Sequence, residues 1–253
     1  MSAFHDRLYI STTAEDAHAL AVTHDLGIEL AEFCTACNMD ENFAAMDHAA
    51  RLAMDGVTRF TFHAPFAEMS PAAVDPLVRE ITARRYRQAI SLAEDYGIHK
   101  VVIHSGFIPL VYFPEWFVPQ SVGFWRDFLR GVSTDMTICL ENVMEPGPDI
   151  MTQIAVGVDD PRFKLCLDVG HANTRVSSTP LDKWIAETAP WLGHVHIHNN
   201  DGDMDLHRPL GEGVIDYDRV LDSLLTLCPE ATCTIENMSA SKSVEWLFAH
   251  HYL

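Results

Sequence analysis

The sequence predicts a single-domain α/β protein that folds as a (β/α)8, or TIM, barrel. Its 253 residues are close to the roughly 250 that are typical of one such barrel. Short β-rich segments alternate with longer amphipathic segments along the chain, which is the pattern of parallel strands joined by crossover helices. Successive strand candidates also end in side chains that can bind metal. We therefore expect one barrel domain over residues 1–253.

The strand candidates are eight short runs rich in aliphatic and β-branched residues. Between the third and fourth runs, residues 72–96 show helical periodicity, and Gly97 supplies a stop. The apolar positions of this helix candidate are Leu77, Ile81, Ala89, Ile90 and Ala93. The eight strand candidates are residues 8–11, 28–33, 59–63, 100–104, 137–143, 163–169, 193–198 and 232–237.

A doubly wound open sheet would show the same alternation of strands and helices. Such a fold binds dinucleotides through a G-x-G-x-x-G segment after its first strand. Here the first strand candidate is followed by Ser11-Thr12-Thr13-Ala14-Glu15, which contains no glycine. The sequence therefore favours the barrel and disfavours a nicotinamide or flavin enzyme.

Composition excludes several classes of function. The 17 Lys and Arg against 36 Asp and Glu give a net charge of −19, which repels a nucleic-acid backbone, so nucleic acid is an unlikely partner. No apolar run approaches the ~18 to 20 residues of a membrane span, and residues 1–7 lack the pattern of a signal peptide. We expect a cytoplasmic protein without a membrane partner.

The six cysteines do not suggest a disulfide framework, because several lie in apolar runs where buried, reduced thiols are usual. Cys34 and Cys37 form one C-x-x-C pair, but no second pair completes a zinc site.

The last six strand candidates each run into a residue that can bind metal. In a parallel barrel these ends converge on the axis, where barrel enzymes place their active sites. A single His or Asp after a strand is often only a capping residue. A buried group of carboxylates and imidazoles with few cations is destabilised unless metal or protons neutralise it, so we expect metal. The residues are His63, His104, Glu141, Asp168, the period-two set His194, His196 and His198, and Glu236.

Two further segments extend this set. Asp168-Val169-Gly170-His171 places an imidazole three residues after the sixth strand's carboxylate. Asp205-Leu206-His207 follows the seventh strand in a polar stretch, directly before the glycine-containing residues 209–213. Glycines there allow the backbone to approach a ligand closely, although they would also suit an ordinary turn.

These segments resemble the xylose-isomerase-like TIM-barrel superfamily, which groups sugar and sugar-phosphate isomerases and epimerases with the endonuclease IV type of DNA repair enzyme (AP endonuclease family 2). The resemblance covers essentially the whole chain. Its most specific parts are residues 140–142, 167–171, 195–198, 205–213 and 235–237.

In the ketose epimerases of this superfamily, a divalent ion is held by Glu, Asp, His and Glu, and the matching positions are Glu141, Asp168, His196 and Glu236. The resemblance implies that Glu141 and Glu236 exchange a proton with the substrate through a metal-stabilised enediolate. It also implies that His171 binds a substrate oxygen. Glu32 is a second substrate-binding candidate, although it would equally suit an exposed loop.

The chain departs from the epimerase pattern in five residues that match further ligands of the three-zinc endonuclease IV site. The resemblance therefore implies one to three ions per chain, of zinc, manganese, magnesium or cobalt. With three ions the reaction would be phosphoester hydrolysis. The five candidate additional ligands are His63, His104, His171, Asp205 and His207.

Residues 107–117 are too apolar for an ordinary loop, and we expect a pocket wall, a lid or a subunit contact of a homo-oligomer. Trp116 within this stretch is a candidate substrate contact. The net charge of −19 and the short connections disfavour a DNA enzyme.

The leading hypothesis is a metal-dependent isomerase or epimerase of carbohydrate metabolism acting on a small sugar, sugar phosphate or polyol. A multinuclear zinc phosphoesterase is the alternative. A barrel that binds without catalysis stays open. A Schiff-base aldolase is disfavoured, because Lys100 and Lys164 start their strands and so lie at the wrong end of the barrel.

Overall fold

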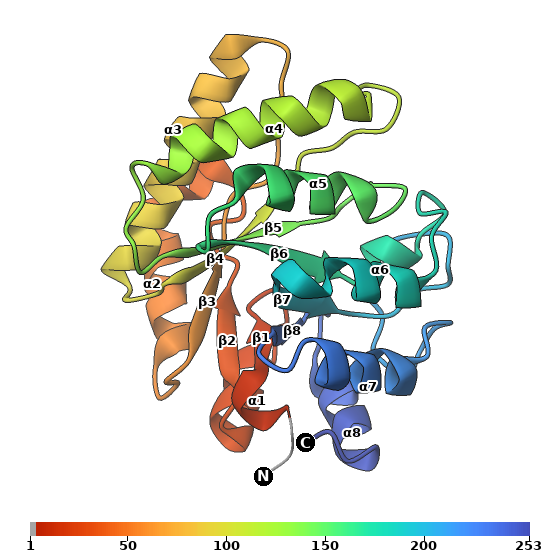
Figure 1. Cartoon of the computed structure of the whole chain (residues 1–253). Coiled ribbons are helices and arrows are strands. Elements are labelled where there is room, and N and C mark those ends of the chain that lie inside the picture. Colours follow the sequence, from red (N-terminus) through yellow and green to blue (C-terminus); the bar gives the residue numbers. More distant parts are fainter. Residues whose placement is uncertain (1–3) are drawn as a thin grey trace.

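Eight parallel strands close into one barrel, in the order β1 to β8, in the computed structural model, which describes residues 4–253 (Figure 1). The fold class predicted from the sequence is confirmed. The register shifts once, between Leu165 and Cys166 where β6 pairs with β7, and β1 closes the barrel by pairing with β8. The strands are β1 (Leu8–Ser11), β2 (Gly27–Leu30), β3 (Phe60–His63), β4 (Lys100–His104), β5 (Thr137–Glu141), β6 (Phe163–Asp168), β7 (Leu192–Ile197) and β8 (Thr232–Ile235).

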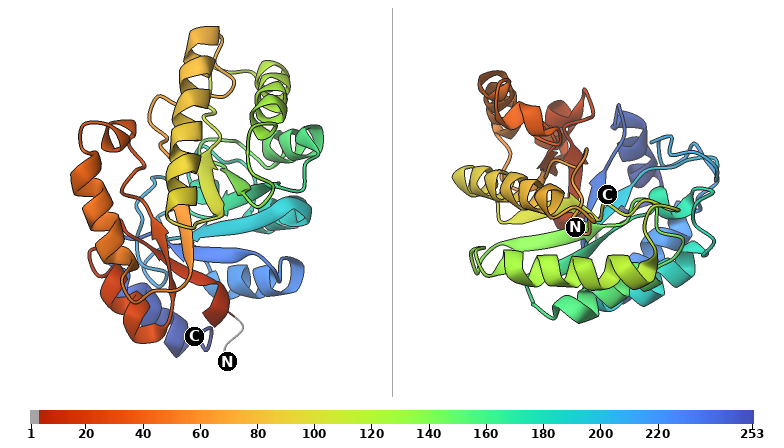
Figure 2. Two further views of the ribbon diagram at one scale, coloured as in Figure 1. Left: turned by 90° about the vertical axis from the view of Figure 1, so that its left-hand side faces the viewer. Right: turned by 90° about the horizontal axis from the view of Figure 1, so that it is seen from above.

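The α-helices lie around the outside of the barrel, as the two views of Figure 2 show. The core packs between this ring and the outward faces of the strands, where residues such as Ile28, Ile103 and Val195 are fully buried. The helices are α1 (Ala17–His24), α2 (Phe43–Met54), α3 (Pro76–Asp95), α4 (Pro114–Leu129), α5 (Asp149–Val158), α6 (Leu181–Thr188), α7 (Tyr217–Leu227) and α8 (Ser241–Ala249).

Helix α3 begins four residues later than the sequence predicted. The Asp75 carboxylate accepts a hydrogen bond from the Leu77 amide, and Pro76 occupies the first turn, where a missing N–H costs little. The C-terminal half of the predicted apolar face is buried, but Leu77 and Ile81 are exposed. Residues 72–75 are therefore free to form a loop near the end of the barrel that carries the candidate site.

The barrel interior is polar. A small apolar layer of Val102, Cys139 and Cys166 lies inside the barrel, and Glu29 and His194 are also fully buried there. Barrel interiors are usually filled by branched aliphatic side chains. Ionisable side chains in place of aliphatic ones indicate that the part of the interior near the C-terminal ends of the strands serves binding or catalysis.

Among residues 4–253, no helix is both long and apolar enough to cross a bilayer.

Candidate metal centre

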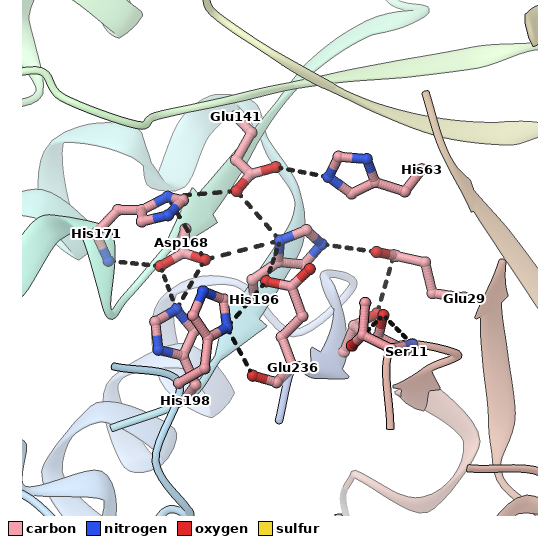
Figure 3. A network of polar contacts seen from close by, with 12 residues as sticks. Ser11, Glu29, His63, Glu141, Asp168, His171, His196, His198 and Glu236 are labelled. Atoms are coloured by element: carbon pink, nitrogen blue, oxygen red, sulfur yellow. Dashed lines mark hydrogen bonds and ion pairs between the residues drawn. The ribbon is translucent and has the colours of Figure 1, made fainter. Parts of the chain in front are cut away.

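Glu141, the last residue of β5, lies at the centre of the candidate site (Figure 3). Its Oε1 is 3.3 Å from His196 Nδ1 and 3.4 Å from His171 Nδ1. Its Oε2 is 3.4 Å from His63 Nε2 and 3.3 Å from His104 Nε2. One buried carboxylate therefore faces four imidazoles that come from β3, β4, β7 and the segment after β6.

His196 Nδ1 is the point at which the four-residue core meets. Besides Glu141, it lies 3.8 Å from Asp168 Oδ2 and 3.5 Å from Glu236 Oε2. These residues stand at the ends of β5, β6 and β7 and directly after β8. The structure thus brings together the four core ligands expected from the sequence.

The core residues can bind a divalent cation, because several of their buried oxygen and nitrogen atoms have no hydrogen-bond partner. Both oxygens of Glu141 and both ring nitrogens of His196 are buried without a hydrogen bond of normal geometry. A buried polar atom left without a partner costs about 1 to 3 kcal/mol, and more if it is charged. Carboxylate oxygens and imidazole nitrogens are the ligands of zinc and of related first-row metals.

A second group of ligands adjoins the core through Asp168. The Asp205 Oδ2 atom is 3.2 Å from His171 Nε2 and 3.1 Å from His207 Nε2. His198, which the sequence analysis named in the period-two set but not among the core or additional ligands, places Nε2 3.1 Å from Asp168 Oδ1 and joins the same cluster. The site therefore contains the five residues expected as additional ligands, together with the imidazole of His198.

Local backbone geometry supports this second group. His207 has a φ of 45°, in the left-handed region that side chains other than glycine rarely adopt. A hydrogen bond from the Asn237 side-chain amide to the His207 carbonyl holds that conformation, at 2.9 Å. At Gly170 any side chain would overlap the ring of His198.

The imidazoles and carboxylates shift each other's protonation. Burial alone would raise the pKa of Glu141, but His104 and His196 outweigh it and hold that pKa well below its usual value. Burial alone would lower the pKa of His207, but the hydrogen bond to Asp205 and the charge of Glu236 raise it to about 9. Without metal, His207 is therefore protonated at neutral pH.

Metal uptake by this cluster should release protons at pH 7.5. A metal ligand must be a neutral imidazole, whereas His207 with a pKa of about 9 carries a proton until the pH exceeds that value. We expect apparent affinity to rise from pH 7 to pH 9 and to level off above it. Calorimetry of zinc binding in two buffers of different ionisation enthalpy measures the proton count, and equal heats in both buffers would contradict the expectation.

Glu29 in β2 is a residue of the site that the sequence analysis did not single out. Its Oε1 lies 3.0 Å from His196 Nε2, on the side of the ring away from the core. Thr61 and Thr234 donate hydrogen bonds to its Oε2 at 2.9 and 3.1 Å, and His194 Nε2 is 3.1 Å from the same oxygen. The Glu29 carboxylate thus faces the Nε2 edge of the His196 ring, and Nδ1 of that ring is turned toward the three carboxylates. A charged residue between Ile28 and Leu30 in a strand was the available signal.

Replacing Glu29 by Gln should weaken metal binding by roughly 10 to 100-fold, the usual cost of losing a group that orients a metal-bound histidine. The amide keeps the size of the side chain but removes the charge that faces two imidazoles. Competition with a chromophoric chelator measures the affinity. Glu94→Gln, an exposed change on α3, is the matched control. Unchanged affinity in Glu29→Gln would show that His196 needs no such support.

Two other predicted substrate contacts lie apart from the core. Glu32 follows the end of β2 and accepts a hydrogen bond from Thr12 Oγ1 at 3.0 Å; burial raises its pKa. The Trp116 indole on α4 donates to the Ala72 carbonyl at 3.1 Å. Neither residue lines the cavity above the metal centre.

That cavity has a volume of about 740 Å³ and opens over the ligands. Its floor includes His63, His104, His171, His207 and Glu236. Its sides are largely apolar and include part of the stretch 107–117 that the sequence suggested as a pocket wall. The cavity is thus large enough for a small organic molecule that contacts the ligands directly.

Comparison with known proteins gives consistent matches. A model of the family described as xylose isomerase-like TIM barrel matches residues 20–248. An uncharacterized protein of Methanocaldococcus jannaschii is 27% identical over 192 residues, which cover 72% of this chain and 66% of that protein, just under two thirds of its length. A probable endonuclease 4 of Ureaplasma urealyticum is 24% identical over 179 residues, which cover 63% of this chain and 58% of that protein.

Among solved structures, that of a D-tagatose 3-epimerase-like protein superposes with a TM-score of 0.78 at 22% identity. The superposition covers 97% of this chain and 96% of the other. The two proteins therefore share the fold over nearly their full lengths.

Proposed function

Because the chain belongs to the xylose isomerase-like TIM barrel family, we propose that it is a divalent-metal-dependent isomerase or epimerase of a small sugar, sugar phosphate or polyol. The observation that carries the proposal is the placement of His196 Nδ1 within 3.8 Å of carboxylates from Glu141, Asp168 and Glu236. Support also comes from the D-tagatose 3-epimerase-like protein, whose structure has the same fold.

Glu141, Asp168, His196 and Glu236 would hold the ion, which when bound supplies Lewis-acid polarisation of a substrate carbonyl. Glu236 is the carboxylate best placed to move a proton, because it lines the cavity and keeps 12% of its side-chain surface exposed. Glu141 is 1% exposed and would return the proton as the second carboxylate of the pair. His171 and His207 line the same cavity and would orient substrate hydroxyl groups.

The test is exchange of solvent deuterium into a carbon-bound position of a ketose. The chain would be loaded in turn with zinc, manganese, magnesium or cobalt and incubated with a panel of ketoses in D2O. Incorporation next to the carbonyl, detected by NMR and abolished by chelator, is the expected result. No incorporation with any metal across the panel would overturn the proposal.

A second candidate function, a multinuclear zinc phosphoesterase, is favoured by the surroundings of Glu141. Its Oε2 faces both His63 and His104, and Asp205 joins His171 and His207 in a further group. This candidate predicts three metals per chain and hydrolysis of a small phosphodiester such as bis(4-nitrophenyl) phosphate. Elemental analysis that gives one metal per chain would exclude it.

A further inference from the structure

Apolar side chains make up a large part of the lining of the cavity above the metal centre. We define its apolar wall as Phe66, Phe107, Ile108, Val143, Met144 and Met238, all of which line the cavity. The wall and the floor are continuous, since the Phe66 ring stacks on the His104 ring with centroids 4.5 Å apart. A ligand that reaches the metal centre therefore also contacts the wall.

The wall offers nothing to a second charged group. None of the lining residues that the structure describes is a lysine or an arginine, whereas Glu68 and Asp205 line the cavity as carboxylates. Burial of an unpaired anion in such surroundings is strongly unfavourable. A phosphate that projects from the metal centre toward the wall would meet no cation.

The cavity is also larger than a simple sugar requires. Its volume of about 740 Å³ equals that of roughly 25 water molecules at ~30 Å³ each. A six-carbon sugar, with about 12 non-hydrogen atoms, would leave around half of that space unfilled. Ile108, Met144 and Met238 on the wall are exposed, so a ligand that covered them would remove apolar surface from water.

From these observations we infer that the site takes an uncharged ligand with two ends. A hydroxylated end reaches the metal centre, and an aliphatic or aromatic substituent packs on the apolar wall. The inference rests on the proposed function for the polar end alone. It narrows the substrate class from free sugars and sugar phosphates to sugars or polyols that carry an apolar group.

Binding of alkyl glucosides to the zinc-loaded chain tests the inference without requiring turnover. Burial of one methylene is worth about 0.8 kcal/mol, or about fourfold in affinity. Hexyl β-D-glucoside should therefore bind at least about tenfold more tightly than methyl β-D-glucoside in calorimetry, below its micellar concentration. A charged chain of similar length, in 5-carboxypentyl β-D-glucoside, should lose this gain, because no lysine or arginine lines the cavity among the described residues. Equal or undetectable binding of the methyl and hexyl glucosides, or equal binding of the hexyl and carboxypentyl glucosides, would overturn the inference.

Variants of the wall residues test whether the hexyl chain binds on the apolar wall. Ile108→Ser and Met144→Ser should lose most of the gain from the hexyl chain over the methyl group. Val156→Ser, an exposed apolar position on α5 outside the cavity, should keep the gain. If Ile108→Ser instead dissociates a dimer in sedimentation and the hexyl gain is absent, the wall is a subunit contact and the inference fails. Deuterium exchange tests the proposed function, and the affinity gain of hexyl glucoside tests this inference. A chain that shows the gain without exchange would support the inference and contradict the proposed function.

Discussion

Glu236→Gln should lower turnover by at least about 10³-fold and leave the barrel folded. A positioned general base contributes roughly 10² to 10⁴-fold on its own, and the same carboxylate lies 3.5 Å from His196 Nδ1 in the core. Glutamine keeps the length of the side chain but can neither accept the proton nor supply the charge. Because Glu236 follows β8 and is partly exposed at the floor of the cavity, we expect only a small change in melting temperature.

The measurements are the rate of deuterium exchange into substrate, metal content and thermal unfolding. Glu230→Gln, an exposed change in the turn after α7, is the control and should match the unmodified chain in all three. A Glu236→Gln chain with full metal content and full exchange would rule out Glu236 as both ligand and base. Loss of exchange with metal retained would identify proton transfer, rather than metal binding, as its main role.

The strands could be predicted closely because each is a short apolar run between polar connections. Two of them, Leu8–Ser11 and Lys100–His104, have the predicted limits. The second strand ends at Leu30, three residues before the predicted end. Apolar character continues through Ala31 and Phe33, which are buried although they lie outside the strand. Composition cannot distinguish an apolar residue in a strand from a buried apolar residue in a loop.

The error in the second strand explains why Glu32 was named and Glu29 was not. Glu32 was placed at the C-terminal end of a strand, where functional side chains were expected, but it lies outside β2. Glu29 lies within β2 and points inward, beneath His196. Whether a side chain can support a metal ligand from below depends on the layer of the barrel interior in which it lies. Strand alternation shows only whether a side chain points into or out of the barrel.

The three histidines of β7 and its end show the same limit. His194, His196 and His198 alternate and so share one side of the strand, as period two predicts. The structure separates them by height. His194 Nε2 faces Glu29, His196 Nδ1 faces the core carboxylates, and His198 Nε2 faces Asp168. Spacing alone does not identify the core ligand among these three histidines. The family resemblance was needed to choose His196.

Trp116 illustrates a different limit. Its stretch was expected to be too apolar for a solvated loop, but Leu110, Val111 and Phe113 are exposed; only Phe107, Ile108 and Tyr112 of the stretch line the cavity. Trp116 itself belongs to the first turn of α4, which begins at Pro114. The helix directs its indole toward the Ala72 carbonyl instead. The apolar character of a segment does not reveal where a helix starts within it.

Asp168→Asn should remove metal from both ligand groups. Because the proposed reaction depends on that metal, turnover should fall by more than about 10³-fold, below detection. Asp168 joins the two groups, since Oδ2 is 3.8 Å from His196 Nδ1 and Oδ1 is 3.1 Å from His198 Nε2. Its backbone is held by Asn142, which donates to the Asp168 carbonyl at 3.0 Å and accepts from its amide at 2.9 Å. The fold should therefore survive the change.

The same variant should change the protonation of the metal-free chain. Burial alone would lower the pKa of His171, but Asp168, together with Asp205 and Glu141, raises it well above its usual value. Loss of the Asp168 charge should lower that pKa, so His171 loses its proton at a lower pH, which NMR titration of labelled histidine would detect. Asp127→Asn, an exposed change on α4, should alter neither metal content nor the titration. If Asp168→Asn kept both metal and turnover, the reaction would have to depend on ligands that do not converge on Asp168, and the two groups would be independent sites.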